Sequence, residues 1–450
     1  MSGFSRRQFF IGAAAPMVAA QRAAEPRPNI LLIVADDLAA WMCGCYGSTE
    51  MRTPNIDLIA RLGARFQYAC ATTPAGSPSR ATLFTGRTPM QHGIEDVLTG
   101  APPASFAGEV MISELLANQG YDCGYVGRWA MGGDQKPGRG YGFTYTMADP
   151  EGPYQDPRMS RNGEVVAEKG YLTELATQAA LGFLDKQTPD KPFFLALGYP
   201  NPAQPYDGHP QKYYDLYANT TFETVGWELP APNASLNQAL LADSVGNLRK
   251  CAAGLSALDA QIPLLLSKLR ARELWTNTLI VFTSDHGNLL GRHGLWGPGR
   301  ASEPVNMYEE VVQVPLLVSW PGEVPVESTR PEIVGLYDVF PTLCQAAGLE
   351  LPAGRNLCGH SFLNRIRGPR VPAGEPDWPT VVYSRYANTL MIRDRRFKLV
   401  DRNGGKGPNE LYHLEKDPRE RRNQYDNDSY LTVRDRLRAY GEEWIESYSG

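Results

Sequence analysis

Two continuous apolar stretches, far apart in the chain, constrain the fold more than any other feature. Residues Asn29 to Ala35 read Asn-Ile-Leu-Leu-Ile-Val-Ala, and residues Thr278 to Ser284 read Thr-Leu-Ile-Val-Phe-Thr-Ser. Both are rich in β-branched residues without an apolar–polar alternation, so each predicts a strand buried on both faces. Acids follow each strand directly, Asp36-Asp37 after the first and Asp285 after the second. In open α/β sheets, ligands bind at these carboxyl ends of strands.

The chain between and around these strands alternates helical and strand patterns, which predicts an α/β fold with a doubly wound, mostly parallel sheet between helices. Helical patterns cover 110–117, 172–184, 236–274 and 337–347, and further strand patterns cover 121–126, 193–197 and 314–319. After Gly368 the pattern changes to short strands at 381–385, 390–393, 397–400 and 411–414, and a helix at 431–448. We therefore expect an α/β domain over 28–368 and a smaller α+β subdomain over 369–450.

Composition limits the class of protein. The 450 residues are 42% hydrophobic and 21% charged, as in globular proteins that bury a sizeable core. The net charge of −5 argues against nucleic acid as a partner, because nucleic-acid binders normally carry a basic surface. Seven cysteines without metal-ligand spacing are interpreted mostly as small buried apolar residues, although Cys43 and Cys45 leave a metal or disulfide open.

The first 24 residues have the pattern of an export signal. Ser5-Arg6-Arg7-Gln8-Phe9-Phe10 resembles the twin-arginine motif, and it precedes a short apolar run and the small residues Val18-Ala19-Ala20. We expect export to a bacterial periplasm or to the exterior, with the signal either cleaved or kept as an anchor. No later segment has the length and apolarity of a membrane span.

The strand-end acids form a candidate metal site. Asp36, Asp37, Asp285 and the following His286 offer three carboxylates and one imidazole, a set suited to a hard cation. Ca²⁺ fits best, Mg²⁺ or Mn²⁺ next, and Zn²⁺ less well because thiolates and further histidines are lacking. The alternative is that Asp285 caps a helix and His286 is an ordinary loop residue.

A candidate anion site lies in the segment 72–87. Pro74, Gly76 and Pro78 predict a turn up to Ser79, which is expected to cap a helix beginning near Arg80. The backbone N–H groups at the start of such a helix lack intrahelical partners and can donate to an anion bound at that end.

The same segment resembles the signature of the sulfatase family, which belongs to the alkaline phosphatase superfamily. In that signature a Cys or Ser, any residue, Pro, Ser and Arg precede a short helix ending in Thr-Gly, and Pro78-Ser79-Arg80 and Thr85-Gly86 match it. Gly76 stands where the family has the Cys or Ser that becomes formylglycine. Further resemblance at 44–47, 53–57 and 410–418 extends the likeness from about residue 28 to the end. It implies calcium bound by Asp36, Asp37, Asp285 and His286.

Other positions depart from the family in the same direction. Gly127-Arg128-Trp129-Ala130 stands where the family has Gly-Lys-Trp-His, and Ala203 replaces the His of Pro-His-x-Pro. Neither alanine can transfer a proton. His293 lies in a matching His-Gly-Leu-Trp-Gly segment, but the expected Lys is Pro298 and the nearest cation is Arg300.

The leading interpretation is therefore a sulfatase homologue with lost or strongly reduced activity and without formylglycine. Arg80 and Arg128, together with Arg300 and His293, are expected to bind a sulfate or phosphate ester or a sulfated glycan.

Two alternatives stay open. In the first, the protein is an active hydrolase or phosphodiesterase whose nucleophile is Ser77, Thr73 or a metal-bound water. In the second, the chain is a structural scaffold that binds no ligand. His209, a few residues beyond Ala203, is a possible replacement for a lost histidine in the first alternative.

Overall fold

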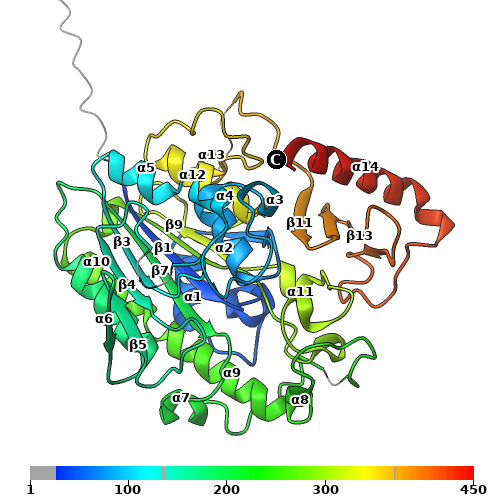
Figure 1. Cartoon of the computed structure of the whole chain (residues 1–450), viewed down its shortest axis with the longest axis horizontal. Helices are drawn as coiled ribbons and strands as arrows, with labels where there is room; N and C mark the ends of the chain where they lie inside the picture. The colour runs from blue at the N-terminus through cyan, green and yellow to red at the C-terminus, as the bar shows by residue number, and fades with distance from the viewer. Residues whose placement is uncertain are drawn as a thin grey trace, which may run out of the picture.

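The computed structural model describes residues 27–133, 135, 137–226, 228–368, 371 and 373–449 (Figure 1). Its centre is a ten-stranded sheet with the strand order β10-β2-β9-β8-β1-β7-β3-β4-β5-β6. The strands are β1 (Asn29–Asp36), β2 (Ala64–Cys70), β3 (Asp122–Gly127), β4 (Phe143–Met147), β5 (Arg158–Arg161), β6 (Glu164–Ala167), β7 (Phe193–Pro202), β8 (Thr278–Ser284), β9 (Leu316–Ser319) and β10 (Ser328–Gly335). The central strands β8, β1, β7, β3 and β4 run parallel, whereas β9, β5 and β6 pair antiparallel with their neighbours.

Helices cover both faces of this sheet (Figure 1). The α-helices are α1 (Pro54–Arg61), α2 (Gly76–Thr85), α3 (Pro89–His92), α4 (Ala104–Ala107), α5 (Ile112–Asn118), α6 (Leu172–Leu184), α7 (Gln211–Asp215), α8 (Gln238–Leu241), α9 (Ser244–Asp259), α10 (Ile262–Ala271), α11 (Glu309–Val312), α12 (Val339–Ala346), α13 (Leu363–Ile366) and α14 (Leu431–Tyr448). Short 3₁₀ helices include η4 (Arg292–Gly294), η5 (Gly299–Ala301) and η6 (Leu336–Asp338).

Strand β1 divides the core into two layers. Leu31, Ile33 and Ala35 pack in the layer that contains α1, α6, α9 and α10. Ile30, Leu32 and Val34 pack in the layer that contains α2, α5 and α12. Because every β1 side chain is buried on one side or the other, the strand has no polar face, which confirms the prediction from its unbroken apolar sequence.

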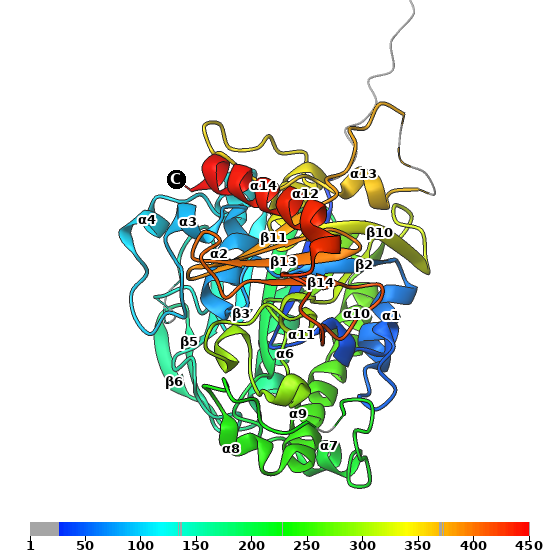
Figure 2. The same cartoon turned by 90° about the vertical axis from the view of Figure 1, so that its right-hand side faces the viewer.

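A smaller antiparallel sheet follows at the C-terminal end, in the order β11-β12-β13-β14 (Figure 2). Its strands are β11 (Val382–Tyr386), β12 (Thr389–Arg393), β13 (Phe397–Arg402) and β14 (Glu410–His413). Helix α14 packs on β12 and β13. The predicted fold class, a mostly parallel doubly wound sheet with a smaller C-terminal α+β unit, is confirmed, while the domain boundary at residue 368 stays a prediction.

Buried ion pairs join the C-terminal sheet to helix α11. Lys398 on β13 is fully buried, and its Nζ lies 3.1 Å from Glu309 of α11 and 2.5 Å from Glu420. Arg393 of β12 also reaches Glu309, at 2.9 Å. Burial alone would raise the pKa of Glu309, but Arg393 and Lys398 lower it to about 2, so this carboxylate is charged at neutral pH.

The structure corrects two local predictions. The helical pattern over 236–274 forms three helices, α8, α9 and α10, because the Asp243 side chain caps α9 at the Gly246 N–H and Pro263 lies in the first turn of a new helix. Strands β2, β4, β5, β6 and β10 were not predicted. The cysteine prediction is confirmed: all seven are free, and all except the half-buried Cys45 are buried.

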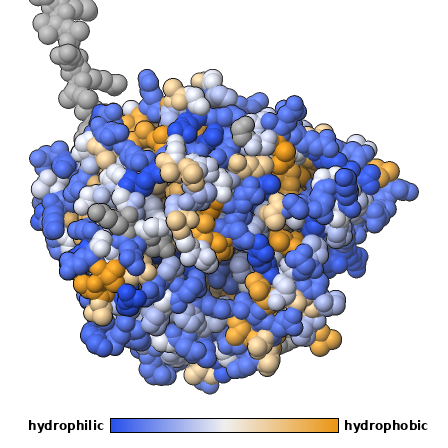
Figure 3. Space-filling view, viewed as in Figure 1, coloured by the Kyte–Doolittle hydropathy of each residue, from blue (hydrophilic) through white to orange (hydrophobic). Residues whose placement is uncertain are grey.

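No helix in the described part of the chain is long and apolar enough to cross a membrane. On the face shown in Figure 3, apolar side chains form small groups scattered among hydrophilic ones. The export signal predicted for residues 1–24 lies outside the described residues.

Candidate functional site

The register of the central sheet brings the strand-end acids together. Strands β1 and β8 are parallel neighbours, with Ala35 opposite Ser284, so Asp36 and Asp285 leave the sheet side by side. Asp37 adopts a left-handed backbone conformation with a φ of 64°, which turns the chain directly after the strand. Aspartate tolerates this conformation better than most residues.

Asp36, Asp37 and His286 form a group that could hold a metal ion. One ligand atom from each of the three lies within 4.8 Å of the other two. Asp36 Oδ2 and Asp37 Oδ1 are buried and accept no hydrogen bond of good geometry among the described residues, although Arg128 and His286 lie 3.0 and 3.1 Å from them as ion pairs. Buried carboxylate oxygens in this situation carry a desolvation cost that a bound cation offsets, so the residues present fit a hard cation.

The imidazole of His286 responds to the negative charge around it. Its Nδ1 lies 3.1 Å from Asp37 Oδ1. Burial alone would lower its pKa, but the carboxylates of Asp285, Asp37 and Asp36 raise the pKa of His286 to about 10. The carboxylates therefore favour a positive charge at this point, which either a proton or a metal ion can supply.

Asp285 is held by three other groups. Its Oδ1 accepts hydrogen bonds from the backbone N–H of His286 at 2.9 Å and of Asp37 at 3.3 Å, and its Oδ2 accepts one from Arg80 Nε at 2.8 Å. The group of Asp36, Asp37 and His286 does not include Asp285. In this arrangement Asp285 orients the loop that carries His286 and pairs with the buried guanidinium.

Arg80 and Arg128 bring two guanidinium groups to the acids. Arg80, fully buried, donates from Nη1 to the carbonyl of Arg128 at 2.9 Å and places Nη2 3.6 Å from Asp36. Arg128 lies 3.0 Å from Asp36 through Nη1 and donates from Nη2 to the exposed Glu151 at 2.8 Å. No sequence pattern indicates a role for Glu151, an acid in an irregular loop.

Gly76 is the first residue of α2 and faces Asp285 and His286. We call Asp36, Asp37, Asp285 and His286 together the acid group. A Cβ built on it would lie 3.4 Å from Asp285 Oδ2 and 3.8 Å from His286 Nε2, which is ordinary van der Waals contact. The position therefore has room for a side chain directed at the candidate metal group, and glycine supplies none.

The predicted helix start at Arg80 is wrong, because α2 already begins at Gly76. Pro78 falls in the first turn, where a missing N–H costs no intrahelical bond. Ser79 is inside the helix instead of capping it, and its hydroxyl donates to the Asp285 carbonyl at 2.5 Å. The N–H groups of the first turn thus belong to residues around Gly76, closer to the acid group than predicted.

The two alternative nucleophiles differ in their surroundings. Ser77 is 1% exposed, and its Oγ accepts a hydrogen bond from the Leu98 N–H at 2.9 Å. Thr73 is fully buried, and its Oγ1 has no hydrogen-bond partner among the described residues. Neither hydroxyl has a described contact with the acid group.

Ala130 and Ala203, which stand at the substituted histidine positions, follow closely after residues beside Asp36. Arg128 pairs with Asp36, and Pro202 lies opposite Asp36 in the sheet. Ala130 follows Arg128 by two residues with a φ of 56° and is buried. Ala203 follows β7, and its carbonyl accepts a hydrogen bond from the Tyr154 hydroxyl at 3.0 Å.

The described contacts of His209 are with Tyr171, Tyr154 and Gly254. Its Nδ1 lies 2.8 Å from the Tyr171 hydroxyl, and its ring packs 4.6 Å from the Tyr154 ring, measured between centroids. Its Nε2 faces Gly254, where a Cβ would approach to 2.7 Å. Burial lowers the pKa of His209 to about 4. His209 is therefore neutral and contributes to packing.

Arg300 and His293 occupy two other clusters. Arg300 is half exposed, donates to the Tyr386 hydroxyl at 2.5 Å and pairs with Asp96. Its helical turn is anchored near Gly76 because the Gly299 N–H bonds to the Pro74 carbonyl at 3.2 Å. His293 stacks on Tyr308 with 3.7 Å between ring centroids and lies 3.4 Å from Glu310.

Comparison with known proteins identifies the class of fold and site. A family model described as "Sulfatase" matches residues 28–349, and one described as "N-sulphoglucosamine sulphohydrolase, C-terminal" matches residues 303–445. The chain belongs to the sulfatase family. Members of this family generally use a metal ion, usually Ca²⁺, in agreement with an acidic group at the strand ends.

Individual relatives match over most of their length. An N-acetylglucosamine-6-O-sulfatase of Bacteroides thetaiotaomicron is 26% identical over 95% of this chain and 88% of the relative. A solved structure of a protein bound to its substrate D-glucosamine-2-N,6-O-disulfate has a TM-score of 0.81 at 24% identity, covering 94% of this chain and 98% of that one. Another, in complex with a neocarrahexaose, has a TM-score of 0.74 at 25% identity, with 94% and 93% covered. The chain is thus related to sulfatases that act on sulfated glycans.

Proposed function

We propose that this protein is an exported member of the sulfatase family that binds a sulfated glycan, or another sulfate or phosphate ester, with lost or strongly reduced sulfuric ester hydrolase activity. The observation that carries the proposal is Gly76. It lies at the start of α2 in contact range of Asp285 and His286, where the family resemblance calls for the formylglycine precursor. A glycine has no side chain that can become an aldehyde or attack sulfur.

The proposed loss extends beyond the nucleophile. Ala130 and Ala203 stand at the two positions where the resemblance implies a histidine for proton transfer. Each general acid or base typically contributes about 10²- to 10⁴-fold in rate. Without the formylglycine precursor and the two histidines, the protein lacks the groups for sulfate-ester hydrolysis, whereas Arg80 and Arg128 remain.

Anion binding is supported by what remains. A Ca²⁺ ion held by Asp36, Asp37 and His286, with Asp285 beside it, would neutralise the carboxylates that Arg80 and Arg128 now pair with. The guanidinium donors would then be available to a sulfate or phosphate oxyanion, which they bind with paired hydrogen bonds. Mg²⁺ and Mn²⁺ fit the same oxygen ligands less well.

A second candidate function is a metal-dependent hydrolase or phosphodiesterase that uses Thr73, Ser77 or a metal-bound water. The buried, unpartnered Thr73 hydroxyl favours it, because such a group carries a cost that a role in catalysis would explain. The hydrogen bond from Leu98 to Ser77 makes Ser77 the weaker choice. A scaffold without a ligand is the third interpretation.

The test combines mass and binding measurements on the purified wild-type protein. The tryptic peptide that contains Gly76 should have its unmodified mass, and aryl sulfate and aryl phosphate turnover should equal a protein-free blank. Calorimetry with calcium present should detect a sulfated glucosamine, and Arg128→Met should weaken that binding by at least about 10-fold, as expected for a charged pair. Calcium-dependent turnover would support the hydrolase, and absence of both turnover and binding would support the scaffold.

Export through the twin-arginine route is a separate part of the proposal, and it rests on the sequence of residues 5–20. Replacing Arg6 and Arg7 by lysine should leave the protein in the cytoplasm of a bacterial host, while the unmodified chain reaches the periplasm. Equal periplasmic amounts of the two would contradict the twin-arginine assignment.

A further inference from the structure

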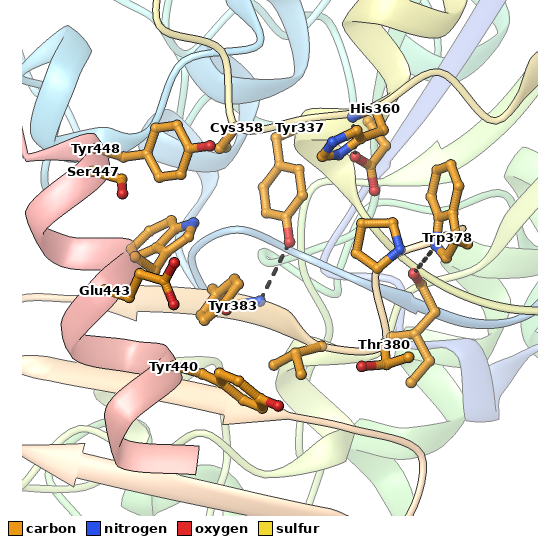
Figure 4. A pocket seen from close by; sticks show the side chains of 15 residues that line it. Tyr337, Cys358, His360, Trp378, Thr380, Tyr383, Tyr440, Glu443, Ser447 and Tyr448 are labelled. Carbon is orange, nitrogen blue, oxygen red and sulfur yellow. Dashed lines mark hydrogen bonds between the residues drawn. The ribbon is translucent and has the colours of Figure 1, made fainter. Parts of the chain in front are cut away.

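A cavity of about 350 Å³ lies between α14, the start of β11 and η6 (Figure 4). Its described lining includes none of Asp36, Asp37, Asp285 and His286. Tyrosines and tryptophans supply much of its wall. Six of the fifteen described lining residues are of these types, and the His360 imidazole lines it as well; the six are Tyr337, Trp378, Tyr383, Tyr440, Trp444 and Tyr448. They come from three segments far apart in the sequence, so the cavity exists only when α14 is docked on the rest of the fold.

Several of these rings are held in place. Tyr383 and Trp444 stack with their centroids 5.0 Å apart and their planes at 12°. The Tyr337 hydroxyl accepts a hydrogen bond from the Tyr383 N–H at 3.3 Å, and Trp378 Nε1 donates to the Ile333 carbonyl at 2.7 Å. A ligand would therefore meet preformed ring surfaces, which lowers the ordering cost of binding.

The ionisable lining residues include two acids and one histidine, His360. None of the fifteen described lining residues is a lysine or an arginine, whereas Asp338 and Glu443 both line it. Asp338 is satisfied by the N–H groups of Gly335 at 2.8 Å and His360 at 2.7 Å, and burial raises its pKa to about 7. Glu443 is exposed to solvent and forms no ion pair with another described residue.

Glu443 and Tyr440 project from α14 on the side of Tyr383, and Tyr448 points from the same helix towards Cys358 (Figure 4). Burial, and after it the nearby Glu443 carboxylate, raises the pKa of Tyr383 to about 12, so this phenol is neutral at physiological pH. Glu443 is exposed to solvent, and beside it the cavity presents neutral aromatic rings. A cation there is attracted both by the carboxylate and by the negative faces of the rings.

We propose that this cavity binds a small organic cation, of the quaternary ammonium or alkylammonium class, with Glu443 as its counter-ion and the rings of Tyr440, Tyr383 and Tyr337 around it. A sulfated or phosphorylated ligand finds no lysine or arginine among the described lining residues to pair with. The described lining of the cavity shares no residue with the anion site, although β11 runs from Tyr383 beside the cavity to Tyr386, which contacts Arg300.

The test uses the full-length protein, with tetramethylammonium chloride as the probe. Binding is measured by calorimetry and by tryptophan fluorescence. Sodium chloride is the control for ionic strength. Neopentyl alcohol provides a neutral molecule of similar shape. We expect one tetramethylammonium per chain, bound at least about 10-fold more tightly than the alcohol because cation–π and charge attraction act only on the cation.

Variants locate the binding. Glu443→Gln should weaken tetramethylammonium by about 10-fold, whereas Glu442→Gln, one residue away on the same helix and outside the cavity, should leave it unchanged. Tyr440→Leu, at a partly exposed position, should also weaken it without unfolding the protein. Absence of binding, equal affinity for neopentyl alcohol, indifference to Glu443→Gln, or tighter binding of N-acetylglucosamine than of the cation would each overturn the proposal.

Discussion

Arg80 Nε lies 2.8 Å from Asp285 Oδ2, and both side chains are fully buried. The pair connects helix α2 to the end of β8, and the same guanidinium donates to the Arg128 carbonyl. A buried ion pair contributes little against an apolar substitute of the same shape, but removing one partner leaves an uncompensated charge. The relative positions of α2, β8 and the loop after β3 therefore depend on Arg80.

Arg80→Met should lower the free energy of unfolding by about 3–5 kcal/mol, because Asp285 then stays buried without its partner. Urea unfolding monitored by fluorescence measures this. The double variant Arg80→Met with Asp285→Asn should be more stable than the Arg80→Met single variant. The matched control is Arg158→Met, whose pair with Asp149 is about half exposed and should contribute less than about 1 kcal/mol. Equal losses for Arg80→Met and Arg158→Met would contradict the argument.

Because the acid group could hold a metal ion, we expect the melting temperature of the protein to depend on calcium. Added Ca²⁺ should raise the melting temperature of the purified protein and a chelator should lower it, since an ion that binds only the folded chain stabilises by about 2.7 kcal/mol at 100 times its Kd. Asp37→Asn should abolish this response, and asparagine tolerates the left-handed backbone at that position. Asp96→Asn, on the Arg300 cluster, should keep it. A melting temperature indifferent to calcium, chelator and Asp37→Asn would disprove the metal site.

The parts of the fold that could be predicted from sequence are those where one physical effect dominates. Strands β1 and β8 are buried on both faces, so their apolar runs alone specify them. Strand β10 lies at the sheet edge and contains Arg330, Pro331 and Glu332, which an edge tolerates but which carry no strand pattern. Strand β6 at the opposite edge and its neighbour β5 are only four residues long each, and no local signal distinguishes them from loops.

The same reasoning applies to the candidate site. Residues that directly follow buried strands, such as Asp36 and Asp285, could be placed together because the sheet register fixes them. The positions of His293 and Arg300 depend on the path of irregular segments, and they contact Glu310 and Asp96, residues that sequence spacing does not connect to them. Loop geometry of this kind is set by tertiary contacts and not by local propensity.

His92 predicts a loss of stability in weak acid. Its Nδ1 accepts a hydrogen bond from the Ile94 N–H at 3.1 Å, and its Nε2 lies 3.2 Å from Thr82 Oγ1, so it is buried in the neutral form. Burial lowers its pKa from 6.5 to about 3. Between these two values the unfolded chain binds a proton that the folded chain does not, so the contribution of His92 is present above pH 6.5 and is lost as the pH falls towards 3.

The expected size is about 1.4 kcal/mol per pH unit inside that window, or about 2 kcal/mol between pH 6.5 and pH 5. Urea unfolding at pH 7, 6 and 5 measures it. His92→Asn retains an acceptor for the Ile94 N–H and cannot titrate, so its stability should fall less over the same range. Parallel pH profiles for wild type and His92→Asn would refute the assignment.

Restoring catalysis distinguishes a protein that lost one residue from one that lost a function. A Cβ at Gly76 meets only ordinary contacts, so Gly76→Cys should fold, and co-expression with a formylglycine-generating enzyme can convert it if the flanking residues are accepted. The two histidine positions would still be alanine. With about 10²- to 10⁴-fold per missing proton-transfer group, the modified single variant should turn over aryl sulfates several orders of magnitude more slowly than an ordinary sulfatase.

Adding Ala130→His, Ala203→His and Arg128→Lys should then raise the rate by more than the product of the separate effects, because residues that act as one catalytic unit are not additive. Histidine is among the residues that tolerate the left-handed backbone of Ala130, so this replacement is compatible with the local structure. Turnover is measured after the aldehyde has been confirmed by mass. Ordinary sulfatase rates in the modified Gly76→Cys single variant would sink the proposal of lost function, because other residues of the chain would then already supply the acid and the base.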